Sequence, residues 1–191
     1  MPGAYNAVNA AGALGLGLAL GLPFGDMARG LAGFGGVRRR FEFKGVAKGV
    51  RVYDDYAHHP TEVGTAALAA ARGVAGAGRV IAVFQPHLYS RTRTFAEAFG
   101  IALGAADLVV VMEVYAARED PMPGVTGALI SQAVPLPAGR VHFEPSWSAV
   151  PGLVASLARS GDVVITIGAG DVTMIGPAVL DVLAAPATEP H

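Results

Sequence analysis

Ten consecutive residues, Tyr53 to Glu62, bring together side chains that could do chemistry. They include two aspartates, two tyrosines and two adjacent histidines, in a protein with only 15% charged residues. Carboxylates accept hydrogen bonds from sugar hydroxyls, and imidazoles bind phosphates and carboxylates near neutral pH. The apolar residues before this stretch predict a strand, and Pro60 with the alanines after it predicts a helix start. Open α/β sheets bind ligands at the carboxyl ends of their strands, so a site is expected here.

Three further polar clusters also follow predicted strands. They are Gln85 to Arg93, Glu113 to Asp120, and Gly168 to Asp171. Four clusters on one edge of a sheet favour a built site over isolated turn residues. Gly168-Ala169-Gly170 matches half of a dinucleotide-binding fingerprint without its third glycine, and a close-packed strand-to-helix turn explains it equally well.

Arg91 and Arg93 stand where a helix is expected to begin. A guanidinium group offers a planar fork of donors to carboxylate or phosphate, and a bound anion would offset the cost of cations at a helix start. The alternative is a solvated helix end paired with Glu97.

The histidines His58, His59 and His87 raise the question of zinc. His58 and His59 are adjacent and point in different directions, and no third ligand has the spacing of a metal site. Histidines that hydrogen-bond to phosphate or carboxylate are therefore favoured over a metal centre.

The composition limits the class of protein. The chain has 191 residues, 52% hydrophobic content, 26 glycines and no cysteine, which suits one α/β core without disulfide or thiolate chemistry. A net charge of −1 gives no positive electrostatic field that would attract nucleic acid. The apolar run Ala10 to Leu22 has no preceding Lys or Arg and is shorter than the about 20 residues of a membrane span, so a buried helix is predicted rather than a signal peptide or a membrane span.

Strands and helices alternate from Phe41 onward. Strands are expected at 41–46, 50–55, 79–85, 107–112, 141–144 and 162–167, and helices at 61–75, 93–104, 126–134, 147–159 and 171–184. The continuous apolar strands predict an α/β fold, a Rossmann-like, doubly wound, mostly parallel sheet with flanking helices. Two earlier helices, 5–21 and 24–33, have no strand of their own to cover and indicate the end of another domain.

These motifs together resemble the Mur ligases. The family string D-D-Y-[GA]-H-H-P-T-E is matched by Asp54 to Glu62, and Q-P-H-x-[YF]-[ST]-R-T by Gln85 to Thr92. R-R-F-E is matched by Arg39 to Glu42, and P-G-x-x-N-x-x-N by Pro2 to Asn9. The matches follow the family's order over nearly the whole chain, and the paired histidines favour the branch that uses L-alanine.

The resemblance implies a cytoplasmic step of peptidoglycan synthesis. ATP, with Mg²⁺, phosphorylates the carboxylate of UDP-N-acetylmuramate, and the amine of L-alanine then attacks the acyl phosphate. Residues 1–40 would be the end of the central ATPase domain, preceding a Rossmann-like carboxy-terminal domain at 41–185 and a flexible tail at 186–191. The chain has no G-x-x-x-x-G-K-[ST] loop, so the phosphate loop, the Mg²⁺ ligands and the UDP-binding domain would lie outside it. We expect no turnover by these residues alone, and self-association or disorder around 1–40.

The resemblance also implies roles for individual side chains. Asn6 and Asn9 would lie near the adenine, while Arg40 and Asp55 would contact the nucleotide, Asp55 at a ribose hydroxyl. The expected substrate-binding residues, which would face the acyl phosphate and the incoming alanine, are Tyr56, His58, His87, Arg91 and, behind them, Arg93. Three of these, His58, His87 and Arg91, are the predicted catalytic residues.

Two positions depart from the family pattern. Tyr5 replaces a frequent histidine, and Leu88 replaces a frequent arginine, so Arg91 would carry more of the substrate contact. A stand-alone nucleotide- or anion-binding module remains an alternative, as does a sister ligase that uses another amino acid or folate.

Overall fold

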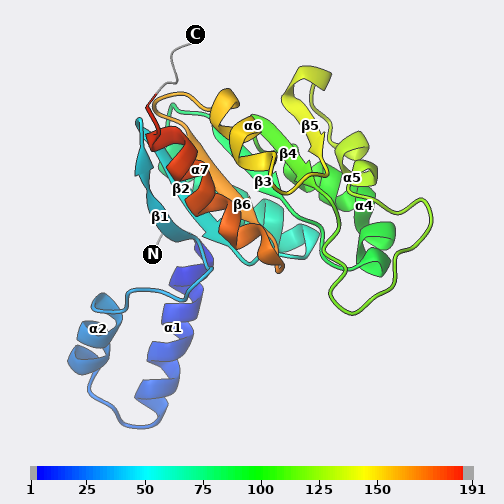
Figure 1. Cartoon of the computed structure of the whole chain (residues 1–191). Coiled ribbons are helices and arrows are strands. Elements are labelled where there is room, and N and C mark those ends of the chain that lie inside the picture. The colour runs from blue at the N-terminus through cyan, green and yellow to red at the C-terminus, as the bar shows by residue number, and fades with distance from the viewer. Residues whose placement is uncertain (1–3, 187–191) are drawn as a thin grey trace.

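The computed structural model describes residues 4–186 as two unequal parts (Figure 1). A six-stranded sheet with helices on both faces forms the main body, and a hairpin of two helices stands apart from it. Two parts of the sequence that carry predictions lie outside the described residues. They are Pro2, which begins the P-G-x-x-N-x-x-N match, and residues 187–191 of the expected tail.

The sheet is mostly parallel and confirms the predicted fold class. Its strand order is β1-β2-β6-β3-β4-β5, with β1 antiparallel to β2 and every other pair parallel. The predicted strands are all present, within one or two residues at their ends. They are β1 (Glu42–Ala47), β2 (Val50–Asp55), β3 (Val80–Phe84), β4 (Leu108–Met112), β5 (Val141–Glu144) and β6 (Val163–Ile167).

The helices also match the sequence pattern, with four differences at their starts. One is in α6 (Val150–Leu157), which begins three residues after the expected start at 147. The predicted helix 61–75 is π-helical in η1 (Glu62–Leu68) before α3 (Ala69–Ala75), and 171–184 begins with a 3₁₀ turn, η3 (Asp171–Met174), before α7 (Ile175–Ala184). Helix α4 (Tyr89–Leu103) begins four residues before the expected start at 93. The remaining helices are α1 (Ala4–Ala19), α2 (Phe24–Ala32), α5 (Ala128–Ala133) and η2 (Ala138–Arg140).

The central strands are buried on both faces, which explains their continuous apolar sequences. Alternate residues of β3 point to opposite sides: Val80, Ala82 and Phe84 join the core beneath η1, α3, α4 and α5. Ile81 and Val83 join the core beneath α6 and α7. A sheet covered on both faces is typical of doubly wound α/β folds.

Close contact between α4 and α5 depends on Gly100, and this gives a test of the packing. A Cβ at Gly100 would lie 2.5 Å from the carbonyl group of Ala133, so Gly100→Ala is expected to lower the free energy of unfolding by about 1–3 kcal/mol. Gly73, an exposed glycine in α3, is the matched control, because a Cβ there meets no atom within 4 Å. Gly73→Ala is expected to raise the free energy of unfolding by about 0.5–1 kcal/mol. Urea denaturation measures both values, and equal effects would contradict this account of the α4–α5 contact.

Arginines bind helix carboxyl ends at the edge of the sheet where the strands begin. Arg51 donates to the carbonyl of Val74 in the last turn of α3 (2.9 Å), and Arg79 donates to that of Leu157 at the end of α6 (2.9 Å). Arg79 also pairs with Asp162 (2.6 Å). Cations stabilise the negative ends of helix dipoles, so these arginines have a structural role.

The helical hairpin exposes much of its apolar surface, in contrast to the buried helix that the sequence predicts for Ala10 to Leu22. Helices α1 and α2 contact each other but stand off the sheet, with the connection 20–23 farthest from it (Figure 1). Val8 and Leu20 are each 70% exposed, and Leu16 is 65% exposed. The structure shows residues 4–19 and 24–32 as regular helices, and self-association through this surface stays a prediction. No helix between residues 4 and 186 is long and apolar enough to span a membrane.

Candidate functional site

The four polar clusters meet at the carboxyl edge of the sheet, as the sequence predicts. Main-chain bonds join neighbouring clusters: Gly168 donates to the carbonyl of Asp55, and Leu88 to that of Tyr115, both at 3.0 Å. The helices after β2 and β3 cover one face, whereas α7, after β6, covers the other. This reversal is the topological switch point where open α/β sheets bind ligands.

The turn after β6 is built around two glycines in close contact with Gln85, the residue that follows β3. A Cβ at Gly168 would lie 2.7 Å from the carbonyl oxygen of Gln85, and one at Gly170 would lie 2.5 Å from its side-chain oxygen. The Gln85 side chain donates to Asp171 (2.7 Å) and accepts from the main chain of Val172 (3.0 Å). The glycines thus serve close packing in the described chain, which is the alternative to a dinucleotide fingerprint.

His87 is held in place by its neighbours but keeps an unused ring atom. Its ring stacks on Tyr115, with centroids 5.7 Å apart and planes 15° apart, and the two residues form a parallel bridge. Leu88, next in the chain, has a φ of 73°, an uncommon value for a non-glycine residue. His87 Nδ1 is buried and has no hydrogen-bond partner within residues 4–186.

Arg91 lies in the first turn of α4 with an equally unused donor. The Nη1 atom of Arg91 is buried and has no hydrogen-bond partner in the described part of the chain. The alternative of a helix end paired with Glu97 is not seen, since Glu97 forms no ion pair among the described residues. The turn is fixed by Glu119, which accepts from the main chain (2.8 Å) and the hydroxyl of Ser90. An unsatisfied buried donor costs about 1–3 kcal/mol, and an anion bound beside His87 and Arg91 would remove that cost.

Burial and neighbouring charges disfavour the protonated form of His87. Burial lowers its pKa from the ordinary value of 6.5, and the nearby positive charges of Arg91 and His58 lower it further, against a smaller opposing effect of Glu119. The hydroxyl and main chain of Ser90 in turn lower the pKa of Glu119, so that this carboxylate stays ionised.

The titration of His87 is a direct measure of this environment. In the free chain, NMR titration is expected to give His87 a pKa below 6.5, so that its contribution to stability is lost as the pH falls from 6.5 through that pKa. Arg91→Gln is expected to raise the pKa, and so is inorganic phosphate, because a bound anion favours the imidazolium. A pKa at or above 6.5 in the free chain would contradict the predicted environment.

Tyr56 and His58 lie together at the end of β2. Their rings meet edge to face with centroids 5.3 Å apart, and His58 Nδ1 lies 3.1 Å from the carbonyl oxygen of Tyr56. Glu62 accepts from the main chain of His58 (3.0 Å) and lies 3.6 Å from its Nδ1. Burial alone would raise the pKa of Glu62, but the main-chain bond from His58 and the charges of His58 and Arg40 lower it.

The two aspartates of the motif are both buried and have separate partners. Asp55, 2% exposed, accepts from the main chain of Phe41 (2.8 Å) and of Ala57 (2.8 Å), and burial raises its pKa. Asp54 is fully buried and accepts from Arg39, Thr166 and Thr173. The predicted ribose contact of Asp55 would therefore come in addition to a structural role.

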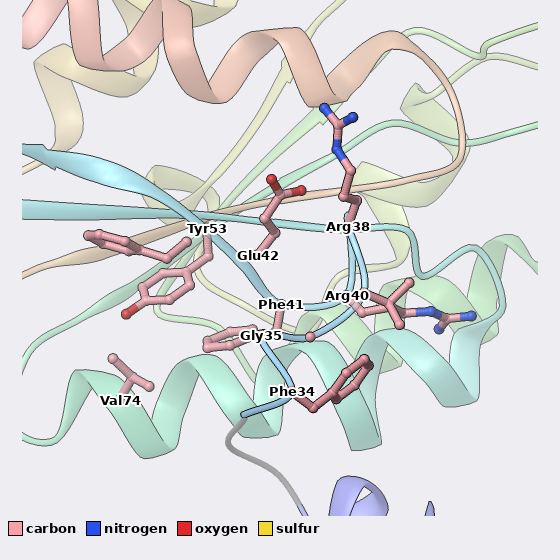
Figure 2. A pocket seen from close by; sticks show the side chains of 11 residues that line it. Phe34, Gly35, Arg38, Arg40, Phe41, Glu42, Tyr53 and Val74 are labelled. Carbon is pink, nitrogen blue, oxygen red and sulfur yellow. The ribbon is translucent and has the colours of Figure 1, made fainter. Parts of the chain in front are cut away.

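The other predicted residues lie outside this group. Arg40 lines a cavity of about 560 Å³ with the stacked rings of Phe41 and Tyr53, whose centroids are 4.4 Å apart. Figure 2 shows Arg38 and Arg40 directed away from those rings. The remaining predicted site residues also lie apart from His87 and Arg91. Arg93 is exposed on α4, and Asn6 and Asn9 lie on α1 of the hairpin.

Sequence reasoning gave no role to three residues that organise the site. Tyr115 stacks on His87, Glu119 fixes the start of α4, and Arg39 binds the main chain of the glycine turn. Tyr115 and Glu119 stand in the third polar cluster, and Arg39 stands beside Arg40 in the R-R-F-E motif, so position in a motif was the available signal. Among residues 4–186, no group of three His, Asp or Glu side chains could hold a metal ion.

Comparison with known proteins gives a consistent result. The family described as Mur ligase, glutamate ligase domain, matches residues 39–170. UDP-N-acetylmuramate–L-alanine ligase of Saccharopolyspora erythraea is 64% identical over 180 residues, covering 94% of this chain and 36% of that protein. The protein of the same name from Kineococcus radiotolerans is 61% identical over 184 residues, covering 96% of this chain and 39% of that protein. The chain thus spans less than half the length of these relatives.

Solved structures show the same relationship. The crystal structure of UDP-N-acetylmuramate–alanine ligase from Thermotoga maritima superposes with a TM-score of 0.75 and 28% identity, covering 95% of this chain and 38% of that one. With the family match covering the sheet up to the glycine turn, and the fold shared over nearly all of the chain, the resemblance predicted from the motifs is confirmed: the chain belongs to the Mur ligase family.

Proposed function

We propose that this chain is the carboxy-terminal part of a UDP-N-acetylmuramate–L-alanine ligase, an enzyme of peptidoglycan synthesis in the cytoplasm. The names of the relatives from Saccharopolyspora erythraea and Kineococcus radiotolerans support the substrates. The observation that carries the proposal is the pair of unused buried atoms, His87 Nδ1 and Arg91 Nη1, at the switch point of the sheet. A site that leaves buried polar atoms unpaired is prepared for a polar ligand.

The reaction joins a carboxylate to an amine at the expense of ATP. The carboxylate of UDP-N-acetylmuramate attacks the γ-phosphorus, ADP leaves, and an acyl phosphate forms. The alanine amine then attacks the acyl carbon, phosphate departs with the electrons of the C–O bond, and the amine loses a proton. Residues of this chain would take part mainly in the second step.

Arg91, His87 and His58 would have distinct tasks in that step. Arg91 would hold the alanine carboxylate or the acyl phosphate through its unused donor, offsetting charge that develops on the departing phosphate. His87 is neutral near pH 7 because its pKa is lowered, so its free Nδ1 could accept the proton from the amine. Tyr56 and His58 would form the adjoining wall, with Arg93 behind them.

The nucleotide would lie between the hairpin and the sheet. Asn6 and Asn9 on α1 would face the adenine, Arg40 the phosphates or ribose, and Asp55 a ribose hydroxyl. The described residues contain no group of acidic or histidine side chains that could hold the Mg²⁺ of the reaction. We also propose that residues 1–40 continue a central ATPase domain and that 41–185 form the carboxy-terminal domain.

The test compares a longer protein that contains this chain with the 191 residues alone. With UDP-N-acetylmuramate, L-alanine and ATP, the longer protein is expected to release ADP and form the amide, detected by mass spectrometry. The 191 residues alone are expected to be inactive, because they have no phosphate loop. Turnover only with another amino acid would favour a sister ligase, and nucleotide binding without turnover by the longer protein would favour a binding module.

A further inference from the structure

Arg39 joins three segments of the site through one half-buried guanidinium group. Its Nε donates to Asp54 (3.2 Å), and its Nη2 donates to the carbonyl oxygens of Gly168 (2.7 Å) and Gly170 (3.1 Å). Its guanidinium carbon lies 4.9 Å from the ring centre of Tyr56, in the geometry of a cation–π contact. The segment before β1, the end of β2 and the turn after β6 therefore meet at this side chain.

The main chain of Arg39 is fixed as firmly as its side chain. Its carbonyl oxygen accepts from the main chain of Tyr56 (2.7 Å), and its NH donates to Glu42 (2.8 Å). The bond from Arg39 is the main reason that the pKa of Glu42 is lowered. Arg39 has a φ of 58°, a left-handed conformation that persists in non-glycine residues where surrounding contacts determine it.

Asp54 makes the side-chain position of Arg39 specific. The Asp54 carboxylate is fully buried, and besides Arg39 it accepts from the hydroxyls of Thr166 (2.7 Å) and Thr173 (2.8 Å). A buried carboxylate needs both a countercharge and hydrogen bonds, and Arg39 is the cation that pairs with it. The planar fork can therefore reach the turn carbonyls while its charge compensates Asp54.

We propose that Arg39 is a positioning residue of the alanine-binding half of the site. It acts through Tyr56, whose ring and main chain it holds, and through the Gly168–Gly170 turn, whose carbonyls it binds. This inference rests on the proposed function, in which Tyr56 lies beside the incoming alanine. It predicts an effect on alanine binding that is separate from ATP binding.

Arg39→Lys is the decisive variant, with Arg38→Lys as its matched control. Lysine keeps the charge but loses the planar fork, whereas Arg38 is exposed and donates no hydrogen bond in the described chain. In the longer ligase, Arg39→Lys is expected to raise the KM for alanine by about tenfold, because small displacements of positioning groups have large effects. The KM for ATP is expected to stay within about twofold for both variants, and Arg38→Lys to match the wild type.

A second measurement on the 191-residue chain separates this inference from the proposed function. Arg39→Lys is expected to shift the amide NMR signals of Tyr56, Gly168 and Gly170, and Arg38→Lys to leave them in place. If the longer protein does not ligate alanine, the proposed function fails, while these shifts still test whether Arg39 positions the site. Unchanged amide signals, or an alanine KM equal to that of the wild type, would overturn the inference.

The wild-type chain provides a test that does not depend on folding of the variant. The Nε–H of Arg39 is expected to exchange with water more slowly than that of Arg38, because it is bonded to the buried Asp54. Equal exchange rates for the two arginines would also overturn the inference.

Discussion

Replacing Arg91 by alanine is expected to lower the kcat/KM of the proposed ligase by about 10²–10³-fold without destabilising the chain, since the loss of one preorganised donor to developing charge costs that much in comparable sites. The free energy of unfolding is expected to stay the same or to rise by up to about 1 kcal/mol, because the variant removes a buried donor without a partner. Steady-state kinetics of the longer protein and urea denaturation of this chain measure the two effects.

Arg140→Ala is the control for Arg91→Ala. Arg140 is exposed at the far edge of the sheet, at the end of η2. The Arg140→Ala variant is expected to match the wild type in both kcat/KM and free energy of unfolding. The free energy of unfolding that Arg91→Ala loses can be compared with the transition-state binding energy calculated from its loss in kcat/KM. Equal losses would show that Arg91 stabilises the fold rather than binding the ligand.

Replacing Asp54 by alanine is expected to lower the free energy of unfolding by about 3–5 kcal/mol, the usual cost of removing one partner from a buried ion pair. The variant leaves Arg39 without its countercharge and removes the acceptor for Thr166 and Thr173. Urea denaturation, with the single Trp147 as the fluorescent reporter, measures the change.

Asp26→Ala is the matched control for Asp54. Asp26 also pairs with an arginine, Arg29, but both side chains of that pair are largely exposed. Exposed pairs contribute little, so a change within about 0.5 kcal/mol is expected. A loss below about 1 kcal/mol in Asp54→Ala would contradict the structural role assigned to this carboxylate.

The sheet could be predicted because its signal is local. Each central strand is an unbroken apolar run, and burial on both faces requires such a run. The start of α4 could not be predicted in the same way. The first turn is fixed by Glu119, 29 residues after Ser90, and by the unusual φ of Leu88, neither of which a helix-propensity pattern reveals.

The site was predictable in its location and less so in its details. Four polar clusters after parallel strands must share an edge, and they do. The sequence could not show that Arg39, rather than its neighbour Arg40, contacts Asp54 and the glycine turn. The two residues are of the same type and differ only in backbone conformation. The positive φ of Arg39 turns its side chain to Asp54, while Arg40 lines the cavity beside Phe41.

Arg91 differs from the arginines at the opposite edge of the sheet in how far its donors are occupied, and this has a consequence for the choice of buffer. At the edge where the strands begin, Arg51 and Arg79 already bind helix carbonyls, and Arg79 also binds a carboxylate. At the other edge, Arg91 retains a buried donor without a partner in the described chain. If Arg91 binds the substrate as proposed, we expect phosphate or sulfate in an assay buffer to bind at the same donor, to compete with the substrate and so to lower the measured activity.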